Sequence, residues 1–193
     1  MREIKLISLG HVQPDLLAYL SLAIPCIFDT PCKETGVMLD HRHAYDSKRA
    51  QYNSTKLLTC LLEKVQNGDR ILGVTEVDLF IPILTFVFGE AQLGGRVALM
   101  SAHRLRPQFY GLANNKRLFY SRCEKEAIHE LGHTYGLIHC SSYDCAMHVS
   151  NSVEQVDLKP SSFCDRCKTV ISSVNPASFI PPFGNRRAKS IIP

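Results

Sequence analysis

The chain has 193 residues, which is enough for one domain with a sizeable hydrophobic core. Its 45% of hydrophobic and 21% of charged residues exclude an intrinsically disordered protein. A net charge of +4 is too small to indicate a nucleic-acid-binding protein. No apolar run approaches the ~18 residues of a membrane span, and the N-terminus lacks the apolar region of a secretion signal. We therefore expect a cytoplasmic protein without nucleic-acid or membrane partners, whose oligomeric state stays open.

Strand and helix patterns alternate in the first half of the chain. Proline at the start of a helix, leucines at helical spacing and short apolar runs distinguish the two kinds of element. The expected elements are a strand at 4–10, a helix at 14–23, a strand at 25–29, a long loop at 30–53, a helix at 54–66 and strands at 70–74 and 78–82. This alternation favours an α/β domain.

The second half begins with a predicted hairpin. Two extended runs, 86–91 and 96–100, flank Gly94 and Gly95. If the first run lies at a sheet edge, its free backbone groups could bind an extended peptide as an added strand. An ordinary interior strand is an equally good interpretation. A long helix is then expected at 116–136.

A histidine motif on this helix predicts a metal site. His129 and His133 stand one turn apart, so both imidazoles can reach one ion. Glu130 points about 100° around the helix from His129, where a carboxylate can accept a proton from water at the ion. Gly136 can end the helix in the left-handed conformation and bring His139 back as a third ligand. Three imidazoles leave one tetrahedral position open, as in catalytic zinc sites.

The length of this motif decides between a metal site and chance. A lone His-Glu-x-x-His sequence can occur on any amphipathic helix, with its histidines merely solvated. Here Gly136 and His139 follow at the offsets of a longer zinc-peptidase motif, and Met147 comes soon after. The extended motif therefore favours a metal site.

Four cysteines beyond the histidines predict a second metal site. Cys140 follows the last histidine directly, Cys145 comes next, and Cys164 and Cys167 form a Cys-x-x-Cys pair. Four thiolates would make a closed, structural zinc site, whereas unrelated reduced thiols are the alternative. Disulfides are less expected in a reducing compartment. The other cysteines show no ligand spacing and are expected to be buried free thiols: Cys26, Cys32, Cys60 and Cys123.

Together these two constellations resemble the archaemetzincins, a branch of the metzincin-like zinc metallopeptidases. The match consists of His129-Glu130-x-x-His133-x-x-Gly136-x-x-His139-Cys140, then Cys145-Ala146-Met147, then Cys164-x-x-Cys167. Residues 86–91 and the region of 74–80 also look like the family. The resemblance thus spans most of the chain and stops before the segment that follows Val170.

The resemblance implies a zincin-like, metzincin-like α/β fold. Its twisted, mostly parallel sheet would carry an antiparallel edge strand, with a long active-site helix and a small C-terminal subdomain stapled by zinc. We expect one domain at 1–173, with the sheet and active-site helix in 1–136 and the subdomain in 137–173. Residues 174–193 would form a Pro-rich tail that can be mobile.

The resemblance also implies two zinc ions per chain and a role for each motif residue. The implied ligands are His129, His133 and His139 for a catalytic zinc, and Cys140, Cys145, Cys164 and Cys167 for a structural zinc. Glu130 would be the general base, and Met147 would pack beneath the catalytic zinc without binding it. Some metzincins have a metal-binding tyrosine two positions after this methionine, where this chain has Val149. Transition-state stabilisation must therefore come from elsewhere.

We accordingly expect a zinc metallopeptidase that hydrolyses peptide or protein substrates with zinc-activated water and Glu130 as general base. Whether it acts as an endopeptidase or an aminopeptidase stays open. The principal alternative is a zinc-dependent binding or regulatory protein with an inert site. A purely structural zinc protein is less favoured, because three histidines beside a glutamate suit an open site.

Overall fold

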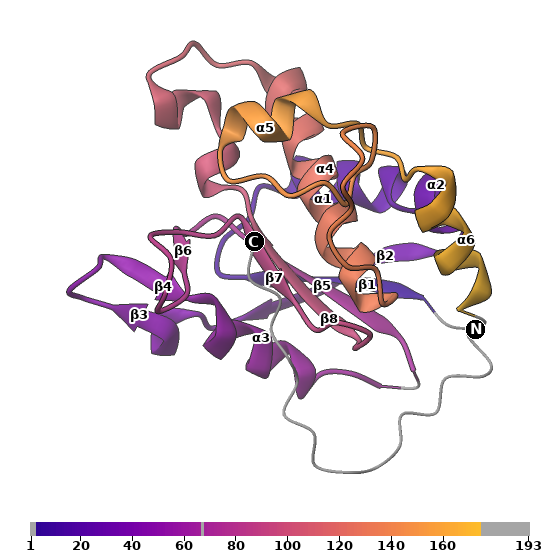
Figure 1. Ribbon diagram of the computed structural model, residues 1–193. Coiled ribbons are helices and arrows are strands. Elements are labelled where there is room, and N and C mark those ends of the chain that lie inside the picture. The colour runs from indigo at the N-terminus through magenta and orange to yellow at the C-terminus, as the bar shows by residue number, and fades with distance from the viewer. Residues whose placement is uncertain (1–2, 67, 175–193) are drawn as a thin grey trace.

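The fold is built on a five-stranded sheet, seen in a computed structural model that describes residues 3–66 and 68–174 (Figure 1). The strands run in the order β2 (Cys32–Leu39), β1 (Ile4–Leu9), β5 (Arg70–Thr75), β8 (Val97–Ser101) and β7 (Gly89–Ala91). The first four are parallel to their neighbours, and β7 pairs with β8 in the antiparallel direction. This confirms the expected α/β fold with an antiparallel strand at one edge.

Helices cover both faces of this sheet (Figure 1). Helices α1 (Pro14–Ala23) and α4 (Lys116–Thr134) pack on one face, and α3 (Ser54–Leu62) packs on the other. The strands alternate accordingly: Leu72, Val74, Ala98 and Met100 join the core under α4, while Ile71, Val97 and Leu99 join the core over α3. Because both faces are buried, the strands read as continuous apolar runs.

The expected second strand at 25–29 is wrong, because this segment is the short helix α2 (Pro25–Phe28). Ile24 remains helical after α1, and Pro25 occupies the first turn, where its missing N–H costs nothing. The Phe28 amide donates to Ile24, and Asp29 then ends the helix in the left-handed region at φ 48°. Its apolar residues therefore face the core from a helical turn.

The expected long loop at 30–53 is also wrong. It contains β2, a 3-10 turn (η1, Arg42–Ala44), β3 (Tyr45–Asp46) and β4 (Gln51–Asn53). Strand β2 lies at the outer edge of the main sheet and is mostly exposed, so it carries no apolar alternation that a sequence could reveal. Strands β3, β4 and β6 (Leu79–Phe80) form a second, three-stranded sheet.

The remaining elements follow the expected order. Helix α3 ends at Leu62, before the predicted end at residue 66, and the hairpin of β7 and β8 is present. Short elements complete the described chain: η2 (His103–Leu105), η3 (Pro107–Tyr110), α5 (Val153–Leu158) and α6 (Asp165–Ser173). The predicted tail falls outside the described residues from position 175 onward, and no described helix is long and apolar enough to cross a membrane.

Candidate metal centres and catalytic residues

The histidine motif lies at the C-terminal end of α4 and in the turn that follows it. Asn115 caps the start of this helix by accepting a hydrogen bond from the Leu118 amide, and Gly136, with φ +89°, ends it. The Gly136 amide donates to the His133 carbonyl, and the Leu137 amide donates to the Gly132 carbonyl. These are the two bonds of a Schellman motif, which turns the chain back toward the helix.

Three imidazoles meet beside this turn. The ring centroids of His129, His133 and His139 lie 4.8 to 5.3 Å apart, and the Nε2 atoms of His129 and His133 are separated by 3.2 Å. One ligand nitrogen from each ring lies within 4.8 Å of the others. A tetrahedral zinc with Zn–N bonds of about 2.0–2.1 Å would need nitrogens roughly 3.3 Å apart. The spacing fits such an ion.

Carbonyl groups orient two of these rings from behind. His129 Nδ1 lies 2.8 Å from the Ala146 carbonyl oxygen, and His133 Nδ1 lies 2.7 Å from that of Leu137. Since a carbonyl only accepts, each Nδ1 carries the proton, and each Nε2 keeps a free lone pair. A carbonyl that accepts a hydrogen bond from the far nitrogen in this way fixes the orientation of a metal-binding histidine.

Burial keeps the three imidazoles neutral. It lowers the pKa of His129 well below its ordinary value, that of His133 to about 4, and that of His139, and the Lys159 ammonium adds to each effect. A neutral imidazole is the form that binds a metal. The donor set therefore has the protonation state that zinc requires.

Glu130 lies where α4 crosses β7. Its side chain is buried against Gly89, and a methyl group at Gly89 would stand 2.6 Å from Glu130 Cγ and 2.5 Å from the Leu99 carbonyl oxygen. Burial, reinforced by the Glu126 carboxylate, raises the pKa of Glu130 well above its ordinary value. Glu130 and His129 line one small cavity together. The Glu130 carboxylate can therefore lie this close to β7 only because residue 89 is a glycine.

Met147 lies beneath the same helix turn. It is fully buried, and its sulfur occupies the space that a side chain at Gly132 would need. The Cys140 amide donates to the Met147 carbonyl at 2.9 Å, which ties the methionine turn to the end of the histidine motif. The methionine therefore packs against the helix turn that carries the histidines.

An ion pair behind the histidines was not predicted from the sequence. Lys159 Nζ lies 2.8 Å from Glu126 Oε1, and both residues are at most 3% exposed. The same ammonium lies 3.5 Å from His129 Nδ1 and 3.5 Å from the His148 carbonyl oxygen. Glu126 precedes Glu130 by one helical turn, which is a weak signal, and nothing in the spacing of Lys159 indicates the contact.

Four cysteine sulfurs form the second cluster. The Sγ atoms of Cys140, Cys145, Cys164 and Cys167 all lie within 4.8 Å of one another, and those of Cys140 and Cys164 are 3.8 Å apart. This separation is far too long for a disulfide, whose sulfurs are ~2.0 Å apart. Zn–S bonds of about 2.3 Å in a tetrahedron would place sulfurs roughly 3.8 Å apart. The cluster fits a zinc ion.

The surroundings of Cys140 favour a thiolate. Burial opposes its ionisation, but the Ser142 amide and the Arg166 guanidinium, whose Nη2 lies 3.3 Å from the sulfur, lower the pKa of Cys140 to about 7. Burial raises the pKa of Cys145 and Cys167 in the absence of a cation. A bound cation would favour the ionised form of every cysteine in the cluster, because it stabilises all four thiolates.

The remaining cysteines are unpaired thiols in different settings. All four are free, as expected, but only Cys123 is buried. Cys32 and Cys60 are half-buried, so the expectation of burial is confirmed for Cys123 alone, and it is wrong for Cys26, which is exposed on α2. The mistaken strand at 25–29 explains the error, because the exposed face of a helical turn was not anticipated.

Comparison with known proteins identifies the family. The model of peptidase family M54 matches residues 29–173. The archaemetzincin of Methanocaldococcus jannaschii is 52% identical over 158 residues, which cover 82% of this chain and 86% of that protein. The chain belongs to the archaemetzincins. It is therefore a zinc metallopeptidase, and the resemblance inferred from the motifs is confirmed.

Two solved structures share the fold of this chain. The Archaeoglobus fulgidus archaemetzincin, crystallised with malonate, matches with a TM-score of 0.76 and 37% identity, covering 87% of this chain and 99% of that one. A zinc-dependent peptidase from Methanocorpusculum labreanum matches with a TM-score of 0.79 and 27% identity, over 87% and 99% of the two chains. The archaemetzincin fold thus extends over 87% of this chain.

Proposed function

We propose that this archaemetzincin hydrolyses peptide bonds at the cluster of His129, His133 and His139, with Glu130 as its general base. The observation that carries the proposal is the convergence of three neutral imidazoles beside a buried carboxylate at the end of one helix. Zinc held there would supply Lewis acidity toward the substrate carbonyl and would acidify water. The proton transfers of the reaction would be carried out by the protein's own side chains.

Glu130 is the group that moves the proton. It lines the same small cavity as His129, and its carboxylate rests on Gly89 of the edge strand. We infer that it accepts a proton from the attacking water and returns it to the amine of the leaving peptide. The buried site around it excludes bulk water, which strengthens every electrostatic interaction with the developing charge.

The edge strand β7 supports binding of the substrate in extended form. Among the described strands β7 has a partner on one side only, namely β8. An extended peptide can add to such an edge through main-chain hydrogen bonds. Since Glu130 lies directly on this strand, a peptide laid along it would pass the carboxylate.

The four cysteines would hold a second, structural zinc. Cys140 follows the last histidine, Cys164 is the N-cap residue of α6, and Cys167 lies within that helix. A zinc ion bound to them would therefore link α6 to the turn that carries the histidines. A closed set of four thiolates leaves no position for a substrate. Its role would be to stabilise the fold. Action in the cytoplasm, where the thiols stay reduced, is part of the proposal.

The test separates turnover from metal binding. A digest of a peptide library by the zinc-loaded enzyme is read by mass spectrometry, alongside Glu130→Gln and the control Glu124→Gln on the same helix. Glu124 accepts a hydrogen bond from Tyr19 and does not line the cavity. We expect cleavage by the wild type and the control, and none by Glu130→Gln with unchanged zinc content. Cleavage by Glu130→Gln would remove Glu130 from the mechanism, and an inert wild type with both zincs bound would favour a binding protein.

A further inference from the structure

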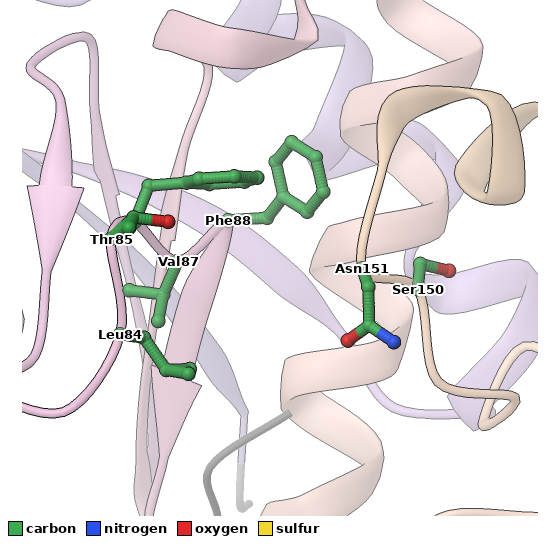
Figure 2. Close-up of a pocket in the computed structure, with 7 residues that line it drawn as sticks. Leu84, Thr85, Val87, Phe88, Ser150 and Asn151 are labelled. Atoms are coloured by element: carbon green, nitrogen blue, oxygen red, sulfur yellow. The ribbon is translucent and has the colours of Figure 1, made fainter.

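A cavity of about 410 Å³ lies outside the candidate catalytic site, between α2 and α6 (Figure 1). The cavity in Figure 2, of about 270 Å³, is a different space, lined by residues 84–88, Ser150 and Asn151. Phe88 and Ser150 also line the space that contains Glu130, so the cavity of Figure 2 belongs to the site already described. No residue that lines the larger cavity lines either of these spaces. A ligand between α2 and α6 therefore leaves the catalytic site open.

Two helices supply opposite sides of this α2–α6 cavity. Residues 27–30 form one side, at the end of α2 and just after it. On the other side, α6 contributes Lys168, Ile171 and Ser172, which share one helix face because they are three and four residues apart. Pockets for small ligands occupy about 300–1,000 Å³, so the cavity is large enough for one.

Aromatic rings form the floor of the cavity. Phe28, Tyr135 and Phe163 line it, and each is at most 8% exposed. The rings of Phe28 and Tyr135 are stacked with centroids 5.0 Å apart, and Phe163 meets Phe28 edge-on at 5.5 Å. The Arg70 guanidinium lies 3.7 Å from the centre of the Tyr135 ring. Because these contacts hold the rings in place, the floor is preformed and receives an apolar group at little ordering cost.

The two sides of the cavity carry opposite charges. Asp29 lies on the α2 side and Lys168 on the α6 side, and both are exposed. The Asp29 amide donates to the Pro25 carbonyl at 3.0 Å, which fixes the backbone at φ 48°. Lys168 Nζ lies 3.5 Å from an Asp165 carboxylate oxygen, in a pair whose side chains are mostly exposed. Such a pair holds the ammonium weakly and leaves it available to a ligand.

The combination of these groups indicates the chemistry of the ligand. A carboxylate on one side suits a cationic end, an ammonium on the other side suits an anionic end, and the aromatic floor between them suits an apolar body. A purely apolar molecule would use neither charge, and a small ion would not use the floor. A short apolar peptide with free termini has all three features, since its ends at pH 7 are an ammonium and a carboxylate.

We propose that the α2–α6 cavity binds a short apolar peptide with free termini, of about the size of a dipeptide. Its ammonium pairs with Asp29, its carboxylate pairs with Lys168, and its side chains rest on the aromatic floor. This binding site goes beyond the proposed peptidase function and does not depend on it. A bound peptide links α2 to α6 and therefore stabilises the folded chain by mass action.

Amide shifts in NMR spectra locate the bound peptide. Zinc-loaded, full-length Glu130→Gln, chosen to suppress cleavage of the ligand, is titrated with the dipeptide Leu-Phe. We expect the amide signals of Asp29, Lys168 and Ser172 to shift with one dissociation constant, while that of His129 stays in place. The Tm should rise with the peptide concentration. An equimolar mixture of leucine and phenylalanine is the control for cleavage and should cause smaller shifts.

Altered peptides test each part of the ligand. Acetyl-Leu-Phe lacks the ammonium and Leu-Phe amide lacks the carboxylate. Each should bind about two- to fivefold more weakly than Leu-Phe, as expected for the loss of one exposed ion pair. Gly-Gly keeps both charges but has no side chains to bury on the rings, so it should bind at least about tenfold more weakly.

Two charge variants assign the ends of the peptide. Asp29→Asn removes the carboxylate, and asparagine tolerates the left-handed backbone at φ 48°. In this variant Leu-Phe and acetyl-Leu-Phe should bind equally, whereas in Lys168→Gln Leu-Phe and its amide should bind equally. Lys56→Gln is the matched control, because Lys56 is exposed on α3 and does not line the cavity. It should keep both differences.

Four results would overturn this site: no saturable shift, shifts confined to the surroundings of the histidines, equal shifts from the dipeptide and the amino-acid mixture, or equal binding of Gly-Gly. Differences between the peptides that survive both Asp29→Asn and Lys168→Gln would exclude the assigned contacts. Shifts of the same amides on dilution without any peptide would identify the cavity as a contact between two copies of the chain. None of these outcomes contradicts the proposed peptidase function, whose test is turnover.

Discussion

Lys159 and Glu126 form an ion pair, 2.8 Å between Nζ and Oε1, that is almost completely withdrawn from water. Lys159 follows α5, and Glu126 lies on α4, so the pair joins the segment after the methionine turn to the active-site helix. The ammonium also lies 3.5 Å from His129 Nδ1. The two opposite charges thus compensate each other, and the pair stands directly behind the cluster of three histidines.

Removal of one partner should therefore be much worse than removal of both. Lys159→Met would leave the Glu126 carboxylate buried without its cation, and we expect the free energy of unfolding to fall by about 3–5 kcal/mol. The double variant Lys159→Met with Glu126→Leu should recover most of this loss, because an apolar pair can replace a buried ion pair at little cost. Urea unfolding of the zinc-saturated proteins measures both. A loss below ~1 kcal/mol in the single variant would mean that water reaches Glu126.

Local chemistry made the histidine and cysteine clusters predictable from the sequence. The spacing of His129 and His133 acts through one helix turn, and Gly136 acts through the next residue or two, so no distant part of the chain has to be known. The same holds for the Cys164 and Cys167 pair at the start of α6. The structure adds the convergence of each set in space.

Contacts between distant segments could not be predicted in this way. Lys159 meets Glu126 only because the chain returns across α4 after α5, and no periodic pattern marks such a lysine. Strand β2 was missed for a different reason: its side chains are mostly exposed at the sheet edge, so hydrogen bonding to β1 defines it and burial does not. Gly89 did carry a signal, since a glycine inside a strand often marks a close approach.

That close approach gives a second prediction. In Gly89→Ala the new methyl group would lie 2.6 Å from Glu130 Cγ and 2.5 Å from the Leu99 carbonyl oxygen, so the carboxylate must move. Displacement of a catalytic group by ~1 Å can cost about 100-fold in rate, so with Glu130 as the proposed general base we expect kcat to fall by that order. Zinc content should stay the same, because no histidine is touched. Wild-type kcat in this variant would show that Glu130 has room to adjust without consequence.

The helix end at Gly136 gives a third prediction. A Cβ atom at this position meets no atom within 4 Å, so the cost of Gly136→Ala comes from the backbone alone, at φ +89°. We expect a loss of roughly 1–2 kcal/mol in the free energy of unfolding, and a smaller one for Gly136→Asn, since asparagine tolerates the left-handed region. Thermal unfolding at saturating zinc should show a decrease in Tm of about 2–4 °C per kcal/mol. Equal stability of the alanine and asparagine variants would contradict the conformational explanation.

The cysteine cluster gives the last prediction, which concerns stability and not catalysis. Cys167→Ala removes one of four sulfurs that lie within 4.8 Å of one another, and three thiolates cannot close the site. The variant should hold one zinc per chain in place of two and lose several kcal/mol of stability, because structural zinc binding contributes on the order of 10 kcal/mol to folding. Elemental analysis and thermal unfolding measure the two effects.

Cys26→Ala is the matched control for this prediction, because Cys26 is an exposed free thiol outside both clusters. It should keep both zincs and the wild-type Tm. His139→Ala should instead lose the other zinc and retain the one on the cysteines, with a smaller decrease in Tm, since its site joins residues that one helix and one turn already hold together. If Cys167→Ala kept two zincs, or if Cys26→Ala lost one, the four cysteines would not be the ligands of a structural ion. Other contacts would then have to hold α6 in place.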